Sequence, residues 1–407
     1  MSIKRTSRLM ALLAVFALFA AACGDSDDST STDTAAPAAE EEAAPATAAA
    51  DEEATATTEA MEEEMAEEAA LPGEGVSVTM GKANWATGYF QAEVYAALMR
   101  ELGYDVGESN IIELAPNAAY VAMAEGQIDF WVNSWYPGHF SWHAGELTDG
   151  SLVGDHITVV GEEMISGGLQ GWLVTKSFAD EYGVYTMDEL NRNADAIAAF
   201  DATDPVPGNG LVDIFGCPES WTCDNIITSF IAFAGWENIQ QTIAGYDAMF
   251  VQAVANADDG IPMVIYTWTP SAYITQLRPG DNVYWMGIEP QSLLDDSNPT
   301  GIEGGADYDQ RPGTATIGTD GCPSSVDGVC PTGWAAADIL ATGNNDFLAG
   351  NPAAEALLGA VKLSVIDVSI ANVSQDAGST PEDLASEWIG NNRDLADSWL
   401  AIALAAG

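Results

Sequence analysis

The alternation of strand and helix patterns after residue 75 constrains the fold of this chain more than any other feature. Strand patterns at 76–80, 111–114 and 128–132 are separated by two helical patterns, one that Gly103 stops and one at 118–125. Each strand pattern is short and apolar, and each helical pattern places its apolar residues on one face. A β-α-β-α-β start of this kind predicts a mostly parallel sheet with right-handed crossovers.

The same alternation restarts after a glycine-rich passage at 167–171, which suggests that the chain crosses there into a second lobe. A chain segment of roughly 340 residues also suits two lobes better than one small core. We therefore expect an α/β protein with two crossings, in which lobe 1 comprises 71–167 and 288–407 and lobe 2 comprises 168–287. The elements expected in the second half are strands at 172–175, 198–200, 263–266, 282–287 and 334–340 and helices opened by Thr186, Asp224, Tyr246, Pro352 and Thr380.

The first 23 residues are typical of an export signal, because Lys4, Arg5 and Arg8 precede an uncharged run that ends at Ala22. The junction before Cys23 is similar to a bacterial lipobox, in which the cysteine becomes the lipidated first residue. The alternative is an ordinary cleaved signal with an incidental cysteine. Lipid attachment at Cys23 would hold the exported protein at the outer face of the bacterial cytoplasmic membrane, and the alternative location is the periplasm.

Residues 24–70 are predicted to form a disordered tether. They hold 16 acidic and no basic residues among mostly Ala, Thr and Ser, so they bury too little apolar surface to offset the entropy of ordering. Residues 71–407 hold 46 acidic and 8 basic residues. So negative a chain is not expected to bind nucleic acid or anionic lipid surfaces.

The five cysteines fit an exported protein. If Cys23 carries a lipid, two closely spaced pairs remain, and an oxidising compartment favours disulfides between Cys217 and Cys223 and between Cys322 and Cys330. Zinc is the competing use of four cysteines, but the chain has no C-x2-C pair.

Three tryptophans lie where turn chemistry begins. Trp135 follows an apolar run and precedes a proline, Trp268 does the same, and Trp221 lies in the loop between Cys217 and Cys223. Ligands of open α/β sheets bind beyond the carboxyl ends of the strands, and indole faces attract methylated cations. The pattern predicts one aromatic cage for a quaternary ammonium solute. Other tryptophans lie inside apolar patterns and are expected to pack in the core: Trp172, Trp236, Trp285, Trp334, Trp388 and Trp399.

A carboxylate of the same ligand would need donors. His139 is placed to donate a hydrogen bond, and a helix start at Thr222 and Cys223 offers free backbone N–H groups. A metal site at His139 and His143 is the weaker interpretation, because no third ligand is evident. We expect no metal and no cofactor.

Catalysis has little support, since no nucleophile elbow, Walker loop, dinucleotide fingerprint or H-E-x-x-H motif is present. The best enzyme alternative is a carbohydrate-active enzyme that stacks sugar on tryptophan and cuts it with paired carboxylates. A tethered adhesin is the interaction-protein alternative, and it predicts an exposed aromatic patch instead of a cleft.

The chain resembles the ProX-like substrate-binding proteins of ABC-type glycine betaine and proline betaine transporters. The matching runs are LPGEGVSV at Leu71, RELGYDV at Arg100, YVAMAEGQIDF at Tyr120, VNSWYPGH at Val132, GLQGWLV at Gly168, the C-x5-C loop around Trp221 and YTWTP at Tyr266.

The resemblance implies a type II periplasmic-binding-protein fold, with two α/β lobes that close on the ligand by a hinge, and no enzymatic activity. It implies that Trp135, Trp221 and Trp268 form the cage, and that His139 and the backbone at Thr222 and Cys223 meet the carboxylate. It further implies a monomer that works with an ABC permease and ATPase. Glu219 departs from the family pattern and would place a negative charge near the site, which would favour choline; carnitine and sulfonium solutes remain alternatives. Trp85 could edge the cleft.

Overall fold

The computed structural model describes residues 70–293, 315–334 and 336–407. The predicted signal peptide, the lipid attachment at Cys23 and all but the last residue of the predicted tether lie outside the described residues. The middle of the turn-rich segment before Thr332 lies outside them as well.

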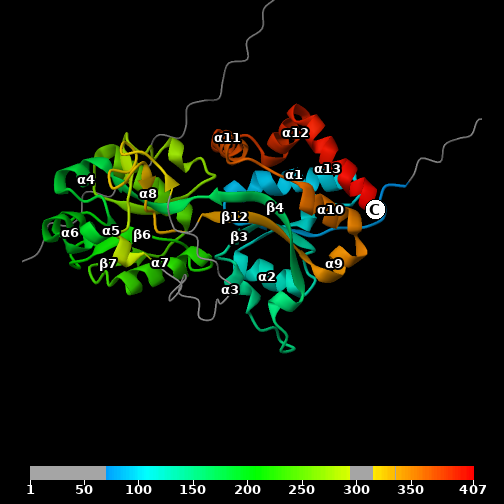
Figure 1. Cartoon of the computed structure of the whole chain (residues 1–407), viewed down its shortest axis with the longest axis horizontal. Helices are drawn as coiled ribbons and strands as arrows, with labels where there is room; N and C mark the ends of the chain where they lie inside the picture. Colours follow the sequence, from blue (N-terminus) through cyan, green and yellow to red (C-terminus); the bar gives the residue numbers. More distant parts are fainter. Residues whose placement is uncertain (1–69, 294–314, 335) are drawn as a thin grey trace, which may run out of the picture. The chain divides into compact units, whose positions relative to one another are not determined.

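Two five-stranded sheets organise the described chain, and we name the elements around them lobe 1 and lobe 2 (Figure 1). Segments from both ends of the described chain, in blue to cyan and in orange to red, gather around the first sheet, whereas green and yellow segments gather around the second. The lobe 1 sheet has the order β2-β1-β3-β12-β4, with β1 Met80–Ala83, β2 Ile111–Leu114, β3 Phe130–Tyr136, β4 Ile157–Gly168 and β12 Ala337–Asn344. The lobe 2 sheet has the order β7-β6-β8-β5-β9, with β5 Gln170–Thr175, β6 Val212–Phe215, β7 Ile239–Thr242, β8 Val264–Trp268 and β9 Val283–Trp285.

Both sheets are mixed, so the prediction of mostly parallel sheets is wrong in part. In lobe 1, β1 runs parallel to β2 and β3, but β12 is antiparallel to both of its neighbours. In lobe 2, β6 runs parallel to β7 and β8, but β5 is antiparallel to both β8 and β9. The antiparallel strands are those next to the crossings, because a strand that arrives from the other lobe enters the sheet from the opposite end.

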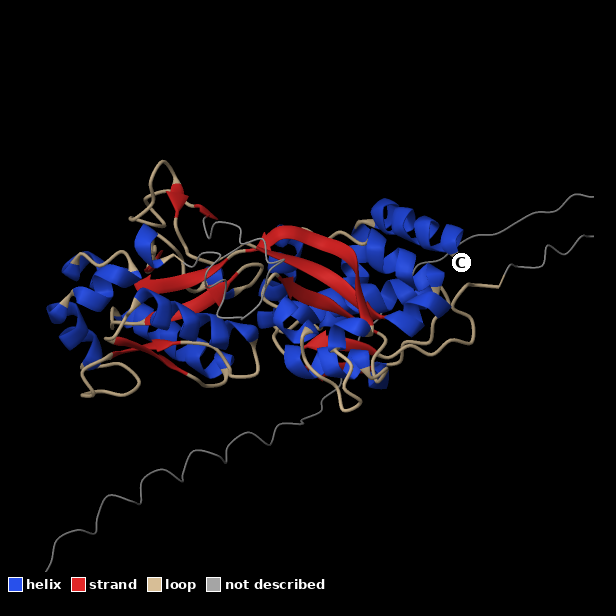
Figure 2. Cartoon of the chain, turned by 60° about the horizontal axis from the view of Figure 1, so that its bottom comes forward, coloured by secondary structure: helices blue, strands red, loops and turns tan. Residues whose placement is uncertain are grey.

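Strands also form the connection between the lobes. The twelve-residue strand β4 ends at Gly168 and β5 begins two residues later, while β12 carries the chain back and pairs with β4 from Ala337↔Gly168 to Asn344↔Ile157 (Figures 1 and 2). A glycine is required at Gly168 because an added Cβ would lie 2.7 Å from the Trp135 ring.

Helices cover the sheets, as Figure 2 shows in blue. Lobe 1 has α1 Thr87–Glu101, α2 Pro116–Ala124, α3 Phe140–His143, α9 Asn345–Gly350, α10 Pro352–Ala360, α11 Val365–Asp376, α12 Pro381–Asn391 and α13 Arg393–Ala406. Lobe 2 has α4 Lys176–Tyr182, α5 Met187–Arg192, α6 Ala194–Asp201, α7 Thr222–Ala234 and α8 Tyr246–Asp259. Within the described residues, no single helix is both long and apolar enough to cross a membrane.

The predicted helix starts at Thr186 and Thr380 are confirmed. Thr186 accepts the N–H of Glu189, whose carboxylate in turn accepts the N–H of Thr186, so the capping box is complete. Thr380 accepts the N–H of Asp383 in front of Pro381.

Other sequence-based assignments are corrected. The apolar run at 198–200, predicted as a strand, belongs to helix α6, which Asn193 caps by accepting the N–H of Ala196. A run of three to five apolar residues does not distinguish a buried strand from a buried helix turn. The first strand starts at Met80 rather than Val76, β12 starts at Ala337 rather than Trp334, and α7 starts at Thr222 so that Asp224 lies inside its first turn.

Both predicted disulfides are present. Cys217 is joined to Cys223 and Cys322 to Cys330, with a Cα–Cα distance of 6.0 Å in each pair. The second disulfide closes a small hairpin of β10 Ala315–Thr316 and β11 Val329–Cys330, which lies beside lobe 2 through the hydrogen bond from Trp285 to the carbonyl of Gly321.

Candidate ligand-binding site

One cavity takes its walls from both lobes. All of the predicted ligand residues border it, and the full lining is Trp85, Pro116, Trp135, Pro137, Gly138, His139, Gln170, Trp221, Thr222, Cys223, Ile226, Phe230, Tyr266, Trp268, Gly333 and Trp334. The cavity has an accessible volume of about 70 Å³, and a cavity of this kind suits one small solute.

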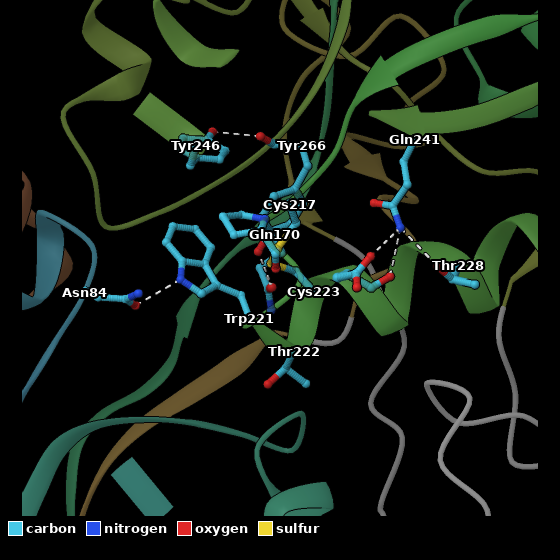
Figure 3. Close-up of a disulfide and its surroundings, with 12 residues drawn as sticks. Asn84, Gln170, Cys217, Trp221, Thr222, Cys223, Thr228, Gln241, Tyr246 and Tyr266 are labelled. Carbon is cyan, nitrogen blue, oxygen red and sulfur yellow. Dashed lines mark hydrogen bonds between the residues drawn. A yellow bond between two sulfur atoms is a disulfide. The ribbon is translucent and has the colours of Figure 1, made fainter. Parts of the chain in front are cut away.

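Trp221 and Trp268 meet edge to face on the lobe 2 side. Their ring centroids lie 5.6 Å apart at an interplanar angle of 80°. Tyr246 of α8 backs both rings, at 5.7 Å from Trp221 and 4.6 Å from Trp268, and its hydroxyl donates to the carbonyl of Tyr266 (Figure 3). Because the rings pack against one another, their orientations are fixed.

Trp135 reaches the cavity from lobe 1. It lies inside strand β3 rather than after it, and its indole N–H donates to the side-chain oxygen of Asn133 over 2.7 Å. Asn133 donates to Gln91 of α1, and Gln91 donates to Glu163 of β4. These three polar side chains are almost completely buried. An indole nitrogen can only donate, so this directional chain fixes the orientation of the Trp135 ring.

Glu163 ends that chain and forms no ion pair with the part of the protein that the structure describes. Burial raises the pKa of its carboxyl from 4.5 to about 8, while the hydrogen bond from Gln91, the nearby hydroxyl of Tyr95 and the positive charge of Lys362 oppose the increase. The carboxyl is therefore neutral at pH 7.

The loop closed by Cys217 and Cys223 carries Trp221 and leads directly into helix α7 (Figure 3). The backbone N–H groups of Thr222 and Cys223 lie in the first turn of the helix, and neither donates to an acceptor in the described residues. Gln241 of β7 donates to the carboxylate and to the carbonyl of Asp224, which anchors this turn to the sheet. Two free donors at the positive end of a helix dipole suit an anionic group.

His139 is buried beside the carbonyl end of β3. Burial lowers its pKa from 6.5 to about 3, with a smaller contribution from His143, so the ring is neutral. Its Nδ1 accepts the backbone N–H of Trp135 over 3.1 Å, and the proton of the neutral ring is therefore on Nε2. Nε2 forms no hydrogen bond within the described residues, and His139 borders the cavity. The ring can thus donate one hydrogen bond to an acceptor in the cavity.

Sequence reasoning missed part of the lining. Trp334, expected to pack in the core, borders the cavity, and its ring also packs against Tyr266, Trp172 and Phe230, at centroid distances of 4.9, 5.3 and 5.5 Å. Tyr266 donates to the side-chain oxygen of Gln170 over 2.7 Å, and both border the cavity. Strand pairing could have indicated these two residues. Gln170 lies opposite Trp268, and Tyr266 lies opposite Trp172, on the neighbouring strands β5 and β8. Trp85, which was expected at the edge of the cleft, also borders the cavity, and its ring centroid lies 5.4 Å from that of Trp221.

Glu219 does not reach the cavity. Its side chain is exposed, and it lies outside the lining, where it raises the pKa of Asp224 as a contribution secondary to burial. Over the described residues, no acidic side chain borders the cavity, and no three His, Cys, Asp or Glu side chains are grouped to hold a metal ion. His143 instead pairs with the hydroxyl of Tyr136 through Nε2 over 2.7 Å.

The chain is similar to solved proteins of one fold. A lactococcal OpuAC crystallised in its closed conformation with glycine betaine matches 80% of this chain and 99% of its own, at 16% identity and a TM-score of 0.55. An ABC-transporter choline-binding protein in complex with choline matches 81% of this chain and 96% of its own, at 15% identity and a TM-score of 0.57. These likenesses confirm the predicted α/β periplasmic-binding-protein fold.

Curated relatives are similar in sequence as well. The glycine betaine/proline betaine-binding periplasmic protein of Salmonella typhimurium is 26% identical over 83% of this chain and 93% of its own length, and that of Escherichia coli is 25% identical over the same shares. Residues 76–391 match the family described as the substrate-binding domain of the ABC-type glycine betaine transport system. The resemblance identified from the sequence runs is thereby confirmed, and the chain belongs to this family of transporter substrate-binding domains.

Proposed function

We propose that the protein is an exported, lipid-anchored receptor that captures glycine betaine or proline betaine in a tryptophan cage and delivers it to an ABC importer. The observation that carries this proposal is the convergence of Trp135, Trp221 and Trp268 on one cavity of small volume. Relatives that share most of this chain's length are named as binding proteins for the same two solutes.

The cavity suits a ligand that carries both a methylated cation and a carboxylate. Indole faces attract the diffuse positive charge of the methylated group by roughly 0.5–2 kcal/mol per ring, and more when water is excluded. The carboxylate would accept from the N–H groups of Thr222 and Cys223 and from Nε2 of His139.

A zwitterion fits better than choline, which reverses the expectation based on Glu219. The described lining contains no acidic side chain, and burying a cation without a counter-charge is costly. Glycine betaine brings its own carboxylate, whereas choline would leave its charge unpaired. The same absence disfavours the glycosidase alternative, which needs two carboxylates at the site.

Calorimetric titration tests this proposal. We expect glycine betaine and proline betaine to bind with micromolar or tighter affinity, choline to bind at least tenfold more weakly, and glucose not to bind. Tryptophan emission should shift with betaine and stay unchanged with glucose. Binding of sugars, or binding of no methylated onium compound, would refute the proposed function.

The role of His139 can be separated from that of the cage. The substitution His139→Asn keeps an acceptor for the N–H of Trp135 but removes the Nε2 donor. We expect glycine betaine to bind at least tenfold more weakly to this variant, since a hydrogen bond to a charged group contributes roughly 1.5–3 kcal/mol. Choline has no carboxylate, so its dissociation constant should change less than twofold in this variant. Equal losses for both ligands would show that His139 acts only through packing.

The lipid anchor needs its own test, because Cys23 lies outside the described residues. Cells that express the full chain should incorporate labelled fatty acid into the wild-type protein and not into Cys23→Ser. Equal labelling of both proteins would exclude lipid attachment at Cys23.

A further inference from the structure

Two side chains outside the cavity lining connect the lobes at the residues that would hold the ligand. Asn84 follows β1 and Trp142 lies in α3, so both belong to lobe 1, and neither borders the cavity. Their hydrogen-bond partners in lobe 2 are Trp221 and Thr222. We propose that Asn84 and Trp142 are positioning residues that stabilise the closed arrangement of the lobes and thereby increase ligand affinity. The inference rests on the proposed function for its ligand, but its structural claim can be tested without one.

The first connection holds the cage ring Trp221. Its indole N–H donates to the side-chain oxygen of Asn84 over 2.9 Å, and Figure 3 shows Asn84 reaching this ring from the blue segment of lobe 1. The backbone N–H of Asn84 donates to the carbonyl of Leu114 in β2, so the acceptor is fixed to the lobe 1 sheet. The neighbouring ring of Trp85 packs edge to face on Trp221 at 5.4 Å. Lobe 1 thus orients a ring that belongs to lobe 2.

The second connection runs in the opposite direction. The indole N–H of Trp142 donates to the hydroxyl of Thr222 over 3.0 Å. Thr222 is the first residue of α7, and its backbone N–H is a proposed donor to the ligand carboxylate. Trp142 is held in turn, because its backbone N–H donates to the carbonyl of His139. The bond therefore connects the His139 segment of lobe 1 to the helix start of lobe 2.

The placement of these bonds makes them specific to closure. The lobes are joined by β4 leading into β5 and by the return through β12. A rotation at these strands would leave their own ladder hydrogen bonds intact, but it would separate Trp221 from Asn84 and Trp142 from Thr222. Affinity for a ligand that binds only the closed form decreases in proportion to the closed fraction. Loss of either bond, which joins neutral groups, should therefore increase the dissociation constant about three- to tenfold.

A double-mutant cycle tests whether the Trp142 bond acts in binding. Trp142→Phe removes the donor and keeps most of the ring, and Thr222→Val removes the hydroxyl at nearly constant volume and keeps the backbone N–H. We expect each single variant to bind glycine betaine about three- to tenfold more weakly and the double variant to be no weaker than the weaker single variant. Asn84→Ala should also weaken binding about three- to tenfold, whereas the control Asn110→Ala should not, because Asn110 is a half-buried asparagine that bonds to Ser77 within lobe 1. If the double variant instead loses affinity by the product of the two single losses, the two side chains act independently, and the proposal is wrong.

A ligand-free measurement separates this inference from the proposed function. Fluorophores on azido side chains at positions 251 of α8 and 366 of α11, both exposed, report the separation of the lobes in single molecules. We expect the ligand-free wild-type protein to show a short-distance population that decreases at least threefold in Trp142→Phe and in Asn84→Ala. An unchanged population, or no such population in the wild type, would refute the inference. A decrease in a protein that binds no onium ligand would refute only the proposed function.

Discussion

Replacing Trp268 with leucine is expected to weaken glycine betaine binding at least tenfold. The ring is 3% exposed, borders the cavity and meets Trp221 edge to face. Leucine keeps apolar contact but has no π-face, so about 2 kcal/mol of cation attraction is lost, which corresponds to roughly thirtyfold in the dissociation constant. The affinity of Trp268→Phe for glycine betaine should lie between those of the wild-type protein and Trp268→Leu, because phenylalanine retains a smaller ring. Calorimetry with glycine betaine measures the effect.

Trp285→Leu is the matched control for this prediction. Trp285 belongs to the same sheet, is 4% exposed and does not border the cavity. It should lose stability to thermal unfolding, as Trp268→Leu should, but it should retain its betaine affinity within about threefold. An unchanged dissociation constant in Trp268→Leu would remove this ring from the cage.

The substitution Glu163→Gln is expected to stabilise the protein by several kcal/mol at pH 8 and to change little at pH 4. The folded state holds the proton of Glu163 up to a pKa of about 8, whereas the unfolded state releases it near 4.5. Between these values the folded state binds more protons, so the contribution of this group to the free energy of unfolding falls by about 1.4 kcal/mol per pH unit as pH rises. Glutamine accepts the same hydrogen bond from Gln91 and does not titrate.

Urea unfolding between pH 4 and 9 measures this difference. The wild-type and Glu163→Gln curves should diverge as pH rises from about 4.5 and run parallel above about 8. Glu162→Gln is the control, because the neighbouring side chain is 69% exposed and its charge is screened by solvent. Parallel curves over the whole range would show that Glu163 is ionised in the folded protein. A divergence shared by Glu162→Gln would assign the effect to net charge.

Short-range patterns in the sequence predicted a good part of the fold. The caps at Thr186 and Thr380, the strand at 111–114 and both disulfides depend on residues close together in the chain, and all were predicted correctly. The assignment at 198–200 was wrong because its apolar run is compatible with two periodicities, and the Asn193 cap selects the helix.

The sequence likewise predicted some residues of the candidate site and not others. The sequence marked Trp135, Trp221 and Trp268 by the turn residues beside them, and His139, Thr222 and Cys223 by their chemistry. It did not separate Trp334 from the core tryptophans, because packing and lining roles give the same local pattern. Nor did it indicate the buried path from Trp135 through Asn133 and Gln91 to Glu163, whose members come from α1, β3 and β4.

The sequence by itself determined the alternating α/β order, the disulfide pairs, the strongly negative charge and the residue types suited to a methylated cation. These properties depend on composition and on the spacing of residues that lie close together in the chain. Only the tertiary structure decided that the rings share one cavity, that no acidic side chain among the described residues borders it, and that Asn84 and Trp142 connect the lobes across it. Such contacts join residues 80 to 137 positions apart in the chain, and their geometry depends on how two sheets and their crossings pack, which no local pattern encodes.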